Sequence, residues 1–324
     1  MKAQVINIVA DIGGTNLRIG VLGNTGEVEL LTVYQCNEYD GLATIVQRFL
    51  LENAIEADQI NACFAIACPV EHDLIKMTNL PWQFLQSELK QVLGFHKLLF
   101  INDYTAIAYA VPFLKDDQKV QIGGGNVVAN KPISICGPGT GLGVANVIPV
   151  GSHWEALGGE GGHVDFAPVD ATETAILVEL LKKYQHVSYE QLLSGQGLEQ
   201  IYQALCFINQ CDLPELSAQE ISAKALAQEC KLCQQALAQF CKTLGSFAGN
   251  LALTLASFGG VYIAGGIVPR FIEYFKKSEF RSRFEEKGRF SLFNSNIPTF
   301  VITESQPGIL GASAYLRQHN KEEL

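Results

Sequence analysis

The fold of this chain is indicated by one stretch near its start, Val9-Ala10-Asp11-Ile12-Gly13-Gly14-Thr15-Asn16-Leu17-Arg18-Ile19-Gly20. Apolar runs at residues 5–9 and 17–22 flank its centre and are typical of buried strands. The adjacent glycines allow positive φ and the close approach of another group, and a row of backbone N–H groups at such a turn forms a concave anion site. The stretch therefore predicts a phosphate-binding turn, with an ordinary hairpin turn as the alternative.

The side chains at this turn are polar and small. Thr15 and Asn16 follow the glycines, and Asp11 precedes them with a negative charge. A carboxylate beside a phosphate site is explained if Mg²⁺ lies between them, usually through water. We therefore expect Asp11 to hold Mg²⁺ through water. The alternative is that Asp11 hydrogen-bonds its own backbone within a hairpin turn.

Composition indicates a globular protein of about two domains. The chain has 324 residues, of which 48% are hydrophobic and 17% charged, and its net charge is −10. These values exclude a disordered chain. The acidic balance, without a basic stripe, predicts no nucleic-acid partner, so a phosphate ligand would have to be held locally by backbone amides, a metal ion and a few cations.

The sequence also predicts a cytoplasmic protein. The first apolar run meets Asp11 too soon for a signal peptide. No apolar segment reaches the roughly 18 uninterrupted residues of a membrane span. The nine cysteines are an odd number and are scattered, which favours a reducing compartment. Cys230 and Cys233 form a single C-x-x-C in an alanine-rich helical stretch, and we do not expect a metal or redox function there.

The opening design occurs a second time in the other half of the chain. Residues 133–136 predict a strand, residues 137–141 (Gly-Pro-Gly-Thr-Gly) a turn, and residues 142–148 a second strand. This is the one internal repeat that we detect. Two phosphate-type turns on duplicated β-rich halves indicate an α/β protein that holds one nucleotide between two domains.

A polar pair, Asn102-Asp103, follows the buried strand predicted at residues 98–101 and precedes a helical run. Open α/β sheets place their chemistry at the carboxyl ends of strands. Phosphoryl transfer needs positioning, charge neutralisation and a group that accepts the proton of the hydroxyl, and a carboxylate suits that last role. The alternative role for Asp103 is the N-cap of the following helix, and one residue could serve both roles.

Two further segments carry candidate ligands. Glu160-Gly161-Gly162-His163 is too rich in glycine for a core segment, and its polar groups suit a sugar, whose hydroxyls both donate and accept hydrogen bonds. Glu190 lies in the first turn of a helix that Ser188 is expected to cap, so stabilisation of that helix end is its alternative role. Gly265-Gly266 ends a predicted strand and leaves room for a flat adenine, although ordinary strand–helix packing would also explain the glycines.

In this order the pieces resemble the sugar-kinase branch of the hexokinase, heat-shock chaperone and actin superfamily, and within it the bacterial glucokinases. The resemblance extends from Val9 to beyond Gly311. The motifs that carry it are Ala67-Cys68-Pro69, Met77-Thr78-Asn79, Ile101-Asn102-Asp103, Gly139-Thr140-Gly141-Leu142-Gly143-Val144, Gly159-Glu160-Gly161-Gly162-His163-Val164-Asp165-Phe166-Ala167-Pro168, Leu193-Ser194-Gly195 and Ile263-Ala264-Gly265-Gly266-Ile267-Val268-Pro269-Arg270-Phe271.

The resemblance implies a two-domain, actin-like ATPase fold of the ribonuclease H-like type. A small α/β domain would comprise residues 1–110 plus 309–324, and a large α+β domain residues 111–308, with the active site in the cleft between them. It also implies ATP and Mg²⁺ as cofactors, D-glucose as the sugar substrate, and a homodimer. The implied activity is ATP-dependent phosphorylation of glucose.

The resemblance assigns roles to individual residues. Asp103 would be the catalytic base that deprotonates the 6-hydroxyl of the sugar. The implied sugar-binding residues are Asn79, Asn102, Asp103, Glu160, His163 and Glu190. The implied ATP-binding residues are Ala10, Asp11, Ile12, Gly13, Gly14, Thr15, Gly139, Thr140, Gly141, Gly265 and Gly266.

Several alternatives remain open from the sequence. The nearest is a kinase for another hexose or an N-acyl hexosamine that uses the same residues. A sugar-responsive repressor would need a DNA-binding module ahead of Asp11; because ten residues precede Asp11 and the net charge is −10, we do not expect a repressor. A chaperone-type ATPase has no need of the sugar-binding set. In the repressor–ORF–kinase group a zinc site follows the histidine, but residues 164–170 contain no cysteine, so we expect no zinc here and a structural role for Asp165.

Overall fold

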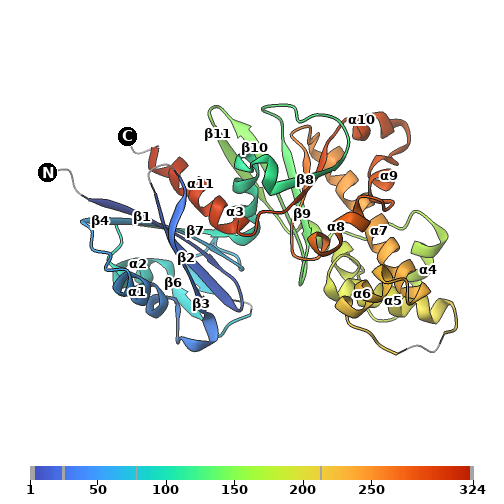
Figure 1. The fold of residues 1–324 in the computed structure, drawn as a ribbon, viewed down its shortest axis with the longest axis horizontal. Coiled ribbons are helices and arrows are strands. Elements are labelled where there is room, and N and C mark those ends of the chain that lie inside the picture. Colours follow the sequence, from blue (N-terminus) through green and yellow to red (C-terminus); the bar gives the residue numbers. More distant parts are fainter. Residues whose placement is uncertain (1–3, 24–25, 78, 212–213, 322–324) are drawn as a thin grey trace. The chain divides into compact units, whose positions relative to one another are not determined.

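A computed structural model describes residues 4–23, 26–77, 79–211 and 214–321. The chain forms two compact units, each of mixed α/β structure (Figure 1). Unit 1 comprises Met1–Leu114, His153–Ala156 and Glu304–Leu324, and unit 2 comprises Lys115–Ser152 and Leu157–Thr303.

Unit 1 is built on a five-stranded sheet with the strand order β3-β2-β1-β4-β7. The central strand β1 pairs antiparallel with β2 and parallel with β4, and β4 pairs parallel with β7. The register places Ile12 opposite Leu17, so β1 and β2 are joined by a tight turn at Gly13–Thr15. The strands of the sheet are β1 (Val5–Ile12), β2 (Asn16–Leu22), β3 (Val28–Gln35), β4 (Gln59–Ile66) and β7 (Lys97–Asn102). The strands β5 (Leu74–Lys76) and β6 (Gln83–Leu85) form a separate hairpin.

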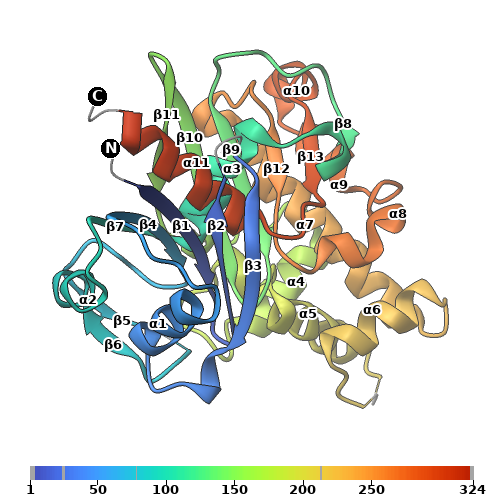
Figure 2. The same cartoon turned by 60° about the vertical axis from the view of Figure 1, so that its left-hand side comes forward.

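Helices cover both faces of this sheet, as Figure 2 shows. Side chains alternate along a strand, and in β1 the buried Ile8, Ala10 and Ile12 join one apolar cluster while Val9 joins another. The first cluster includes side chains of α1 (Leu42–Glu52) and α2 (Gln86–Leu93), and the second includes those of α3 (Asp103–Ala110) and α11 (Pro307–Lys321). Consequently β1 is packed on both faces of the sheet.

Unit 2 repeats the strand order of unit 1 with one strand added. Its order is β11-β10-β9-β12-β13-β8, in which β9 pairs antiparallel with β10 and parallel with β12, and β12 pairs parallel with β13. The strands are β8 (Lys119–Gly123), β9 (Ile133–Pro138), β10 (Leu142–Val150), β11 (His153–Gly158), β12 (Val261–Ile263) and β13 (Thr299–Ile302). The predicted repeat is therefore confirmed: β1–β2 and β9–β10 are equivalent hairpins.

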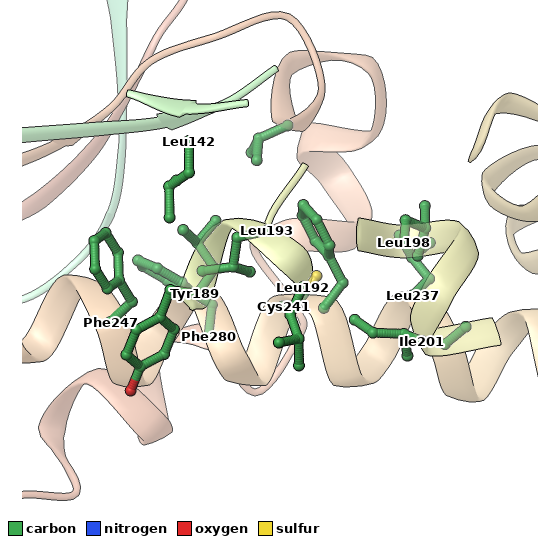
Figure 3. Close-up of a cluster of buried hydrophobic side chains, with 14 of the residues drawn as sticks. Leu142, Tyr189, Leu192, Leu193, Leu198, Ile201, Leu237, Cys241, Phe247 and Phe280 are labelled. Carbon is green, nitrogen blue, oxygen red and sulfur yellow. The ribbon is translucent and has the colours of Figure 1, made fainter. Parts of the chain in front are cut away.

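A helical layer packs on the second sheet. Its helices are α4 (Ala171–Leu180), α5 (Gly195–Ile208), α6 (Ala218–Leu226), α7 (Lys231–Leu255), α8 (Ile272–Phe275), α9 (Phe280–Glu285) and α10 (Ser291–Ser295). The long α7 lies in the core of unit 2: along it, Phe247 lies on the same side as Leu142 at the start of β10, and Leu237 lies near Leu198 and Ile201 of α5 (Figure 3). This core supports the loop ends that carry the candidate site of unit 2.

One sequence expectation about local structure needs correction. The capping box at Ser188 is present, but it opens a single 3₁₀ turn, Tyr189–Gln191, rather than an α-helix. At the other end of the chain, α11 continues through the polar His319 to Lys321. The ring of His319 lies 4.0 Å from that of Tyr315, and its Nδ1 is 2.9 Å from the Tyr315 carbonyl oxygen, so one more helical turn is packed rather than free.

Candidate active site

The turn between β1 and β2 is closed by its own backbone and by a neighbouring segment. The N–H of Gly13 donates to the carbonyl of Asn16 at 3.0 Å, and the carbonyl of Thr15 accepts the N–H of Cys36 at 2.8 Å. A Cβ on Gly14 would lie 2.8 Å from the Cβ of Asn79, so only glycine fits between them. The Thr15 side chain is exposed. The side chains of Ala10 and Ile12 are fully buried, and any contact that they make with a ligand must use the backbone.

Asp11 lies at the end of β1 and faces the start of α11. A Cβ on Gly308 would lie 2.8–3.0 Å from the Asp11 carboxyl group, so this group reaches the first turn of the helix. Burial raises the pKa of Asp11, and the nearby Arg18 partly opposes that shift. Among the described residues no donor makes a hydrogen bond to this carboxylate. The sequence offered no sign that Gly308 would be its neighbour.

The Asn102-Asp103 pair ends β7 and begins α3. Asn102 is the N-cap: its Oδ1 accepts the N–H groups of Tyr104 at 2.9 Å and Thr105 at 3.4 Å, and its Nδ2 donates to the carbonyl of Cys68 at 3.4 Å. The alternative that Asp103 is the N-cap is therefore wrong, although its Oδ1 also accepts from Tyr104 at 2.9 Å.

The pKa of the Asp103 carboxyl group lies above the usual value for an aspartate. Burial, the largest cause, raises its pKa from 3.8 to about 6. The N–H of Tyr104 opposes the shift, and the negative charge of Asp11 adds to it. A carboxyl with this pKa is largely ionised at neutral pH and is a stronger base than an ordinary aspartate. Helix capping does not explain the raised pKa of Asp103, because burial causes it and the N-cap of α3 is Asn102.

The turn of unit 2 lies against the N-terminus of α5. The N–H of Gly139 donates to the carbonyl of Gly141 at 2.8 Å, and the carbonyl of Gly139 accepts the N–H of Gly195, the first residue of α5, at 2.9 Å. The N-cap of α5 is Ser194, which accepts from Gly197 at 2.9 Å. A helix N-terminus with free N–H groups favours an anion beside it.

Glu190 connects this turn to the glycine-rich loop. Its Oε2 accepts the N–H of Leu142 at 2.8 Å, and a Cβ on Gly141 would collide with this carboxylate. Its Oε1 lies 3.8 Å from Nε2 of His163, which in turn is 4.0 Å from the Glu160 carboxylate. The expected role of Glu190 in stabilising a helix end is not what the structure shows, because its carboxylate binds the β9–β10 turn instead.

The structure thus brings Glu160, His163 and Glu190 together in unit 2. Their side chains are 86%, 55% and 32% exposed, so a polar ligand can reach all three. Asn102 and Asp103 adjoin each other in unit 1, where Asn79 lies beside Gly14 and is exposed. The cluster in unit 2 offers two carboxylates and an imidazole, a set that suits a polyhydroxyl ligand.

The two glycines after β12 differ in whether the surrounding packing leaves room for a side chain. Gly265 has φ +82°, and a Cβ there would collide with the backbone of Pro138 at the end of β9. Packing therefore requires glycine at this position. A Cβ on Gly266 would meet nothing within 4 Å. The packing explanation covers Gly265 but not Gly266, whose exposed backbone remains a candidate surface for a flat ring.

Sequence reasoning missed His186, which has no motif around it. Its Nδ1 lies 3.1 Å from the Asp165 carboxylate, and its Nε2 lies 3.0 Å from the backbone carbonyl oxygen of His163. Only the fold brings these residues together, because residues 164–166 and 187–189 pair side by side.

In the part of the chain that the structure describes, no three His, Cys, Asp or Glu side chains are arranged to hold a metal ion. Within the same residues, no helix has both the length and the apolar character needed to cross a membrane. All nine cysteines are free thiols.

Comparison with known proteins places the chain. A model of the glucokinase family matches residues 8–319. The glucokinase of Colwellia psychrerythraea is 58% identical over 320 residues, which is 97% of each chain. The crystal structure of a glucokinase from an Antarctic psychrotroph superposes with a TM-score of 0.89 at 36% identity and covers 97% of this chain and 99% of that one.

A more distant structure shares the fold alone. The glucokinase of Balamuthia mandrillaris, solved in complex with glucose, has a TM-score of 0.79 at 22% identity and covers 97% of this chain and 94% of that one. The family match spans both glycine turns, the Asn102-Asp103 pair and the cluster around Glu190. From its sequence and its fold, this chain belongs to the glucokinase family.

Proposed function

We propose that this chain transfers the γ-phosphoryl group of ATP to the 6-hydroxyl of D-glucose and releases glucose 6-phosphate and ADP. Membership of the glucokinase family supports the reaction. One observation carries the mechanism: the Asp103 carboxyl follows directly on β7, Asn102 rather than Asp103 is the N-cap of α3, and burial raises the pKa of Asp103 to about 6. Asp103 accepts the proton as the hydroxyl oxygen attacks the γ-phosphorus, and Asn102 holds Asp103 in place by capping α3.

The phosphates of ATP are proposed to bind at the two glycine turns. Gly13, Gly14 and Thr15 would contact them from one unit, and Gly139, Thr140 and Gly141 from the other. The N-terminus of α5, which hydrogen-bonds to Gly139, adds a positive dipole end at the second turn. The adenine would lie on the backbone of Gly265 and Gly266, a proposal supported by the open space above Gly266.

Asp11 is proposed to hold Mg²⁺ through water. The carboxylate fits this role because oxygen is the ligand that Mg²⁺ prefers and because none of the described donors hydrogen-bonds to it. Burial raises the pKa of Asp11, so a nearby cation would favour its ionised form. When bound, the ion would neutralise charge on the transferring phosphoryl group.

The sugar is proposed to bind to Glu160, His163 and Glu190 from unit 2 and to Asn79, Asn102 and Asp103 from unit 1. Glu190 is the best supported of the first group, because its carboxylate already binds the start of β10 and is held in one place. A sugar hydroxyl that reached its free Oε1 would also lie near the His163 ring.

The finer architecture is likewise a proposal. The two units would correspond to the domains expected at residues 1–110 plus 309–324 and 111–308, in an actin-like, ribonuclease H-like arrangement with the active site in the cleft between them. The identical order of the first five strands in the two sheets supports it. A homodimer is proposed from the family resemblance, and a cytoplasmic location from the nine free thiols.

The reaction is tested by following ADP release across a panel of glucose, fructose, mannose and N-acetylmannosamine. Glucose should have the highest kcat/KM. Equal values across the panel would contradict glucose as the substrate and favour another hexose or an N-acyl hexosamine. Release of ADP at the same rate without sugar would indicate an ATPase.

Closure of the cleft is tested separately. Sugar binding should draw the two units together, because closure on water alone would waste ATP. A distance label that spans the units should report a shorter distance when glucose is added without ATP. An unchanged distance would contradict closure while leaving the reaction intact.

A further inference from the structure

His186 joins two segments that carry the proposed sugar ligands. Residues 164–166 pair with residues 187–189: the N–H of Tyr189 donates to the carbonyl of Val164 at 3.1 Å, and the N–H of Phe166 donates to the carbonyl of Val187 at 2.9 Å. Glu160 and His163 precede the first of these segments, and Glu190 follows the second. The spacing between the His163 ring and Glu190 therefore depends on how firmly this short pairing is held.

The ring of His186 bridges the two segments. Its Nε2 hydrogen-bonds to the backbone carbonyl oxygen of His163 at 3.0 Å, and its Nδ1 lies 3.1 Å from the Asp165 carboxylate. The side chain of His186, which directly precedes the second segment, thus contacts both His163 and Asp165 at the end of the glycine-rich loop. A carbonyl oxygen can only accept a hydrogen bond, so Nε2 must carry a hydrogen.

The protonation state of the ring follows from these contacts. A neutral imidazole with hydrogen on Nε2 would turn the Nδ1 lone pair toward a carboxylate oxygen, which is also an acceptor. Only the doubly protonated imidazolium makes both contacts attractive. The bridge therefore needs a hydrogen on each of the two ring nitrogens.

Other charged groups nearby have partners of their own. Glu160 and Glu190 face the His163 ring. Upstream of His186, Lys182 pairs with Glu179 at 2.7 Å and Lys183 lies 3.4 Å from the side chain of Gln203. Among the charged side chains of these described segments, Asp165 is the one that contacts the His186 ring.

We propose that His186 is a positioning residue for sugar binding: by holding Asp165 and the His163 carbonyl together, it sets the place of His163 and Glu160 opposite Glu190. The proposal rests on the proposed sugar site. It concerns the affinity for sugar rather than the chemical step. Because the His186 side chain is 54% exposed and water weakens such a pair, the effect should be modest.

The test compares His186→Ala with His186→Gln, and uses His72→Ala on unit 1 as the matched control. The alanine variant should raise the KM for glucose by about 3- to 10-fold and leave kcat and the KM for ATP within about twofold. The glutamine amide can still donate to the His163 carbonyl. It should therefore recover part of the affinity for glucose that the alanine variant loses.

A second measurement does not depend on activity. Hydrogen–deuterium exchange of the peptide 160–168 in the free protein should speed up in His186→Ala. If peptide 160–168 exchanges faster in His186→Ala but the wild type does not phosphorylate glucose, the structural role of His186 stands and the proposed sugar site is rejected. The proposal would be overturned if both His186 variants kept the glucose KM and the exchange rate of the wild type. Equal increases in the KM values for glucose and ATP would also overturn it.

Discussion

Replacing Asp103 with asparagine separates a catalytic base from a structural carboxylate. The substitution keeps the size of the side chain, and the amide oxygen can still accept the N–H of Tyr104 that Asp103 accepts at 2.9 Å. The N-terminus of α3 should survive, because Asn102 caps it. What is lost is the proton acceptor and one negative charge near Asp11.

The expected loss of rate follows from the role of a base. General-base catalysis contributes roughly 10²- to 10⁴-fold, so kcat should fall at least about 100-fold. The carboxyl with a pKa of about 6 is matched to neutral pH, which places the loss toward the larger value. The dissociation constant for glucose should change by less than about tenfold, because the amide can still contact the hydroxyl.

The pH dependence gives a second signature. The base acts when deprotonated, so kcat/KM of the wild type should rise with pH through about 6, and this step should be missing in the variant. Stability changes in the opposite sense. Since folding raises the pKa from 3.8 to about 6, the folded protein binds more protons in that window and loses stability as the pH rises through it.

The Asp103→Asn variant has no ionisable carboxyl at this position, so it does not lose this stability as the pH rises. Above about pH 6 it should be more stable than the wild type by at most about 3 kcal/mol, since each pKa unit is worth about 1.4 kcal/mol. Below the unfolded pKa of 3.8 the difference should vanish. The assay measures kcat, the glucose dissociation constant by calorimetry and the unfolding midpoint at two pH values on one preparation, with the exposed Asp116→Asn as the control. A kcat within a few-fold of the wild type would refute the base and make Asp165 the next carboxylate to test.

Three further outcomes are expected. His163→Ala should raise the KM for glucose far more than the KM for ATP, by the roughly 5- to 150-fold that corresponds to 1–3 kcal/mol; an equal rise in both would contradict a sugar contact. Gly265→Ala should lower the unfolding midpoint, because its φ is +82° and Pro138 is in the way, whereas Gly266→Ala should fold normally and raise the KM for ATP; the reverse pattern would reject the adenine site. Arg283→Met should cost about 3–5 kcal/mol in denaturant unfolding, because it leaves the fully buried Glu173, now 2.8 Å from the guanidinium, without its charge partner; a loss below about 1 kcal/mol would show that the pair is dispensable.

The sequence by itself determined the strands, the turns and their repetition. Apolar runs and glycine pairs encode β1–β2 and β9–β10 within a few residues each, so local patterning was enough to find both hairpins. The position of Asn102-Asp103 at the end of a buried strand followed in the same way. The resemblance across the whole chain pointed to the family that the comparisons then identified.

Only the tertiary structure decided which partners these residues have. The reach of Asp11 to Gly308, the bond from Leu142 to Glu190 and the bridge at His186 each join segments far apart in the chain. Asn102 rather than Asp103 caps α3 because the backbone is extended at Asn102 and becomes helical at Asp103. The raised pKa of Asp103 depends on how much water the surrounding side chains exclude. Burial, hydrogen-bond geometry and the field of neighbouring charges are properties of the packed chain, because they are set by residues that local sequence patterns do not connect.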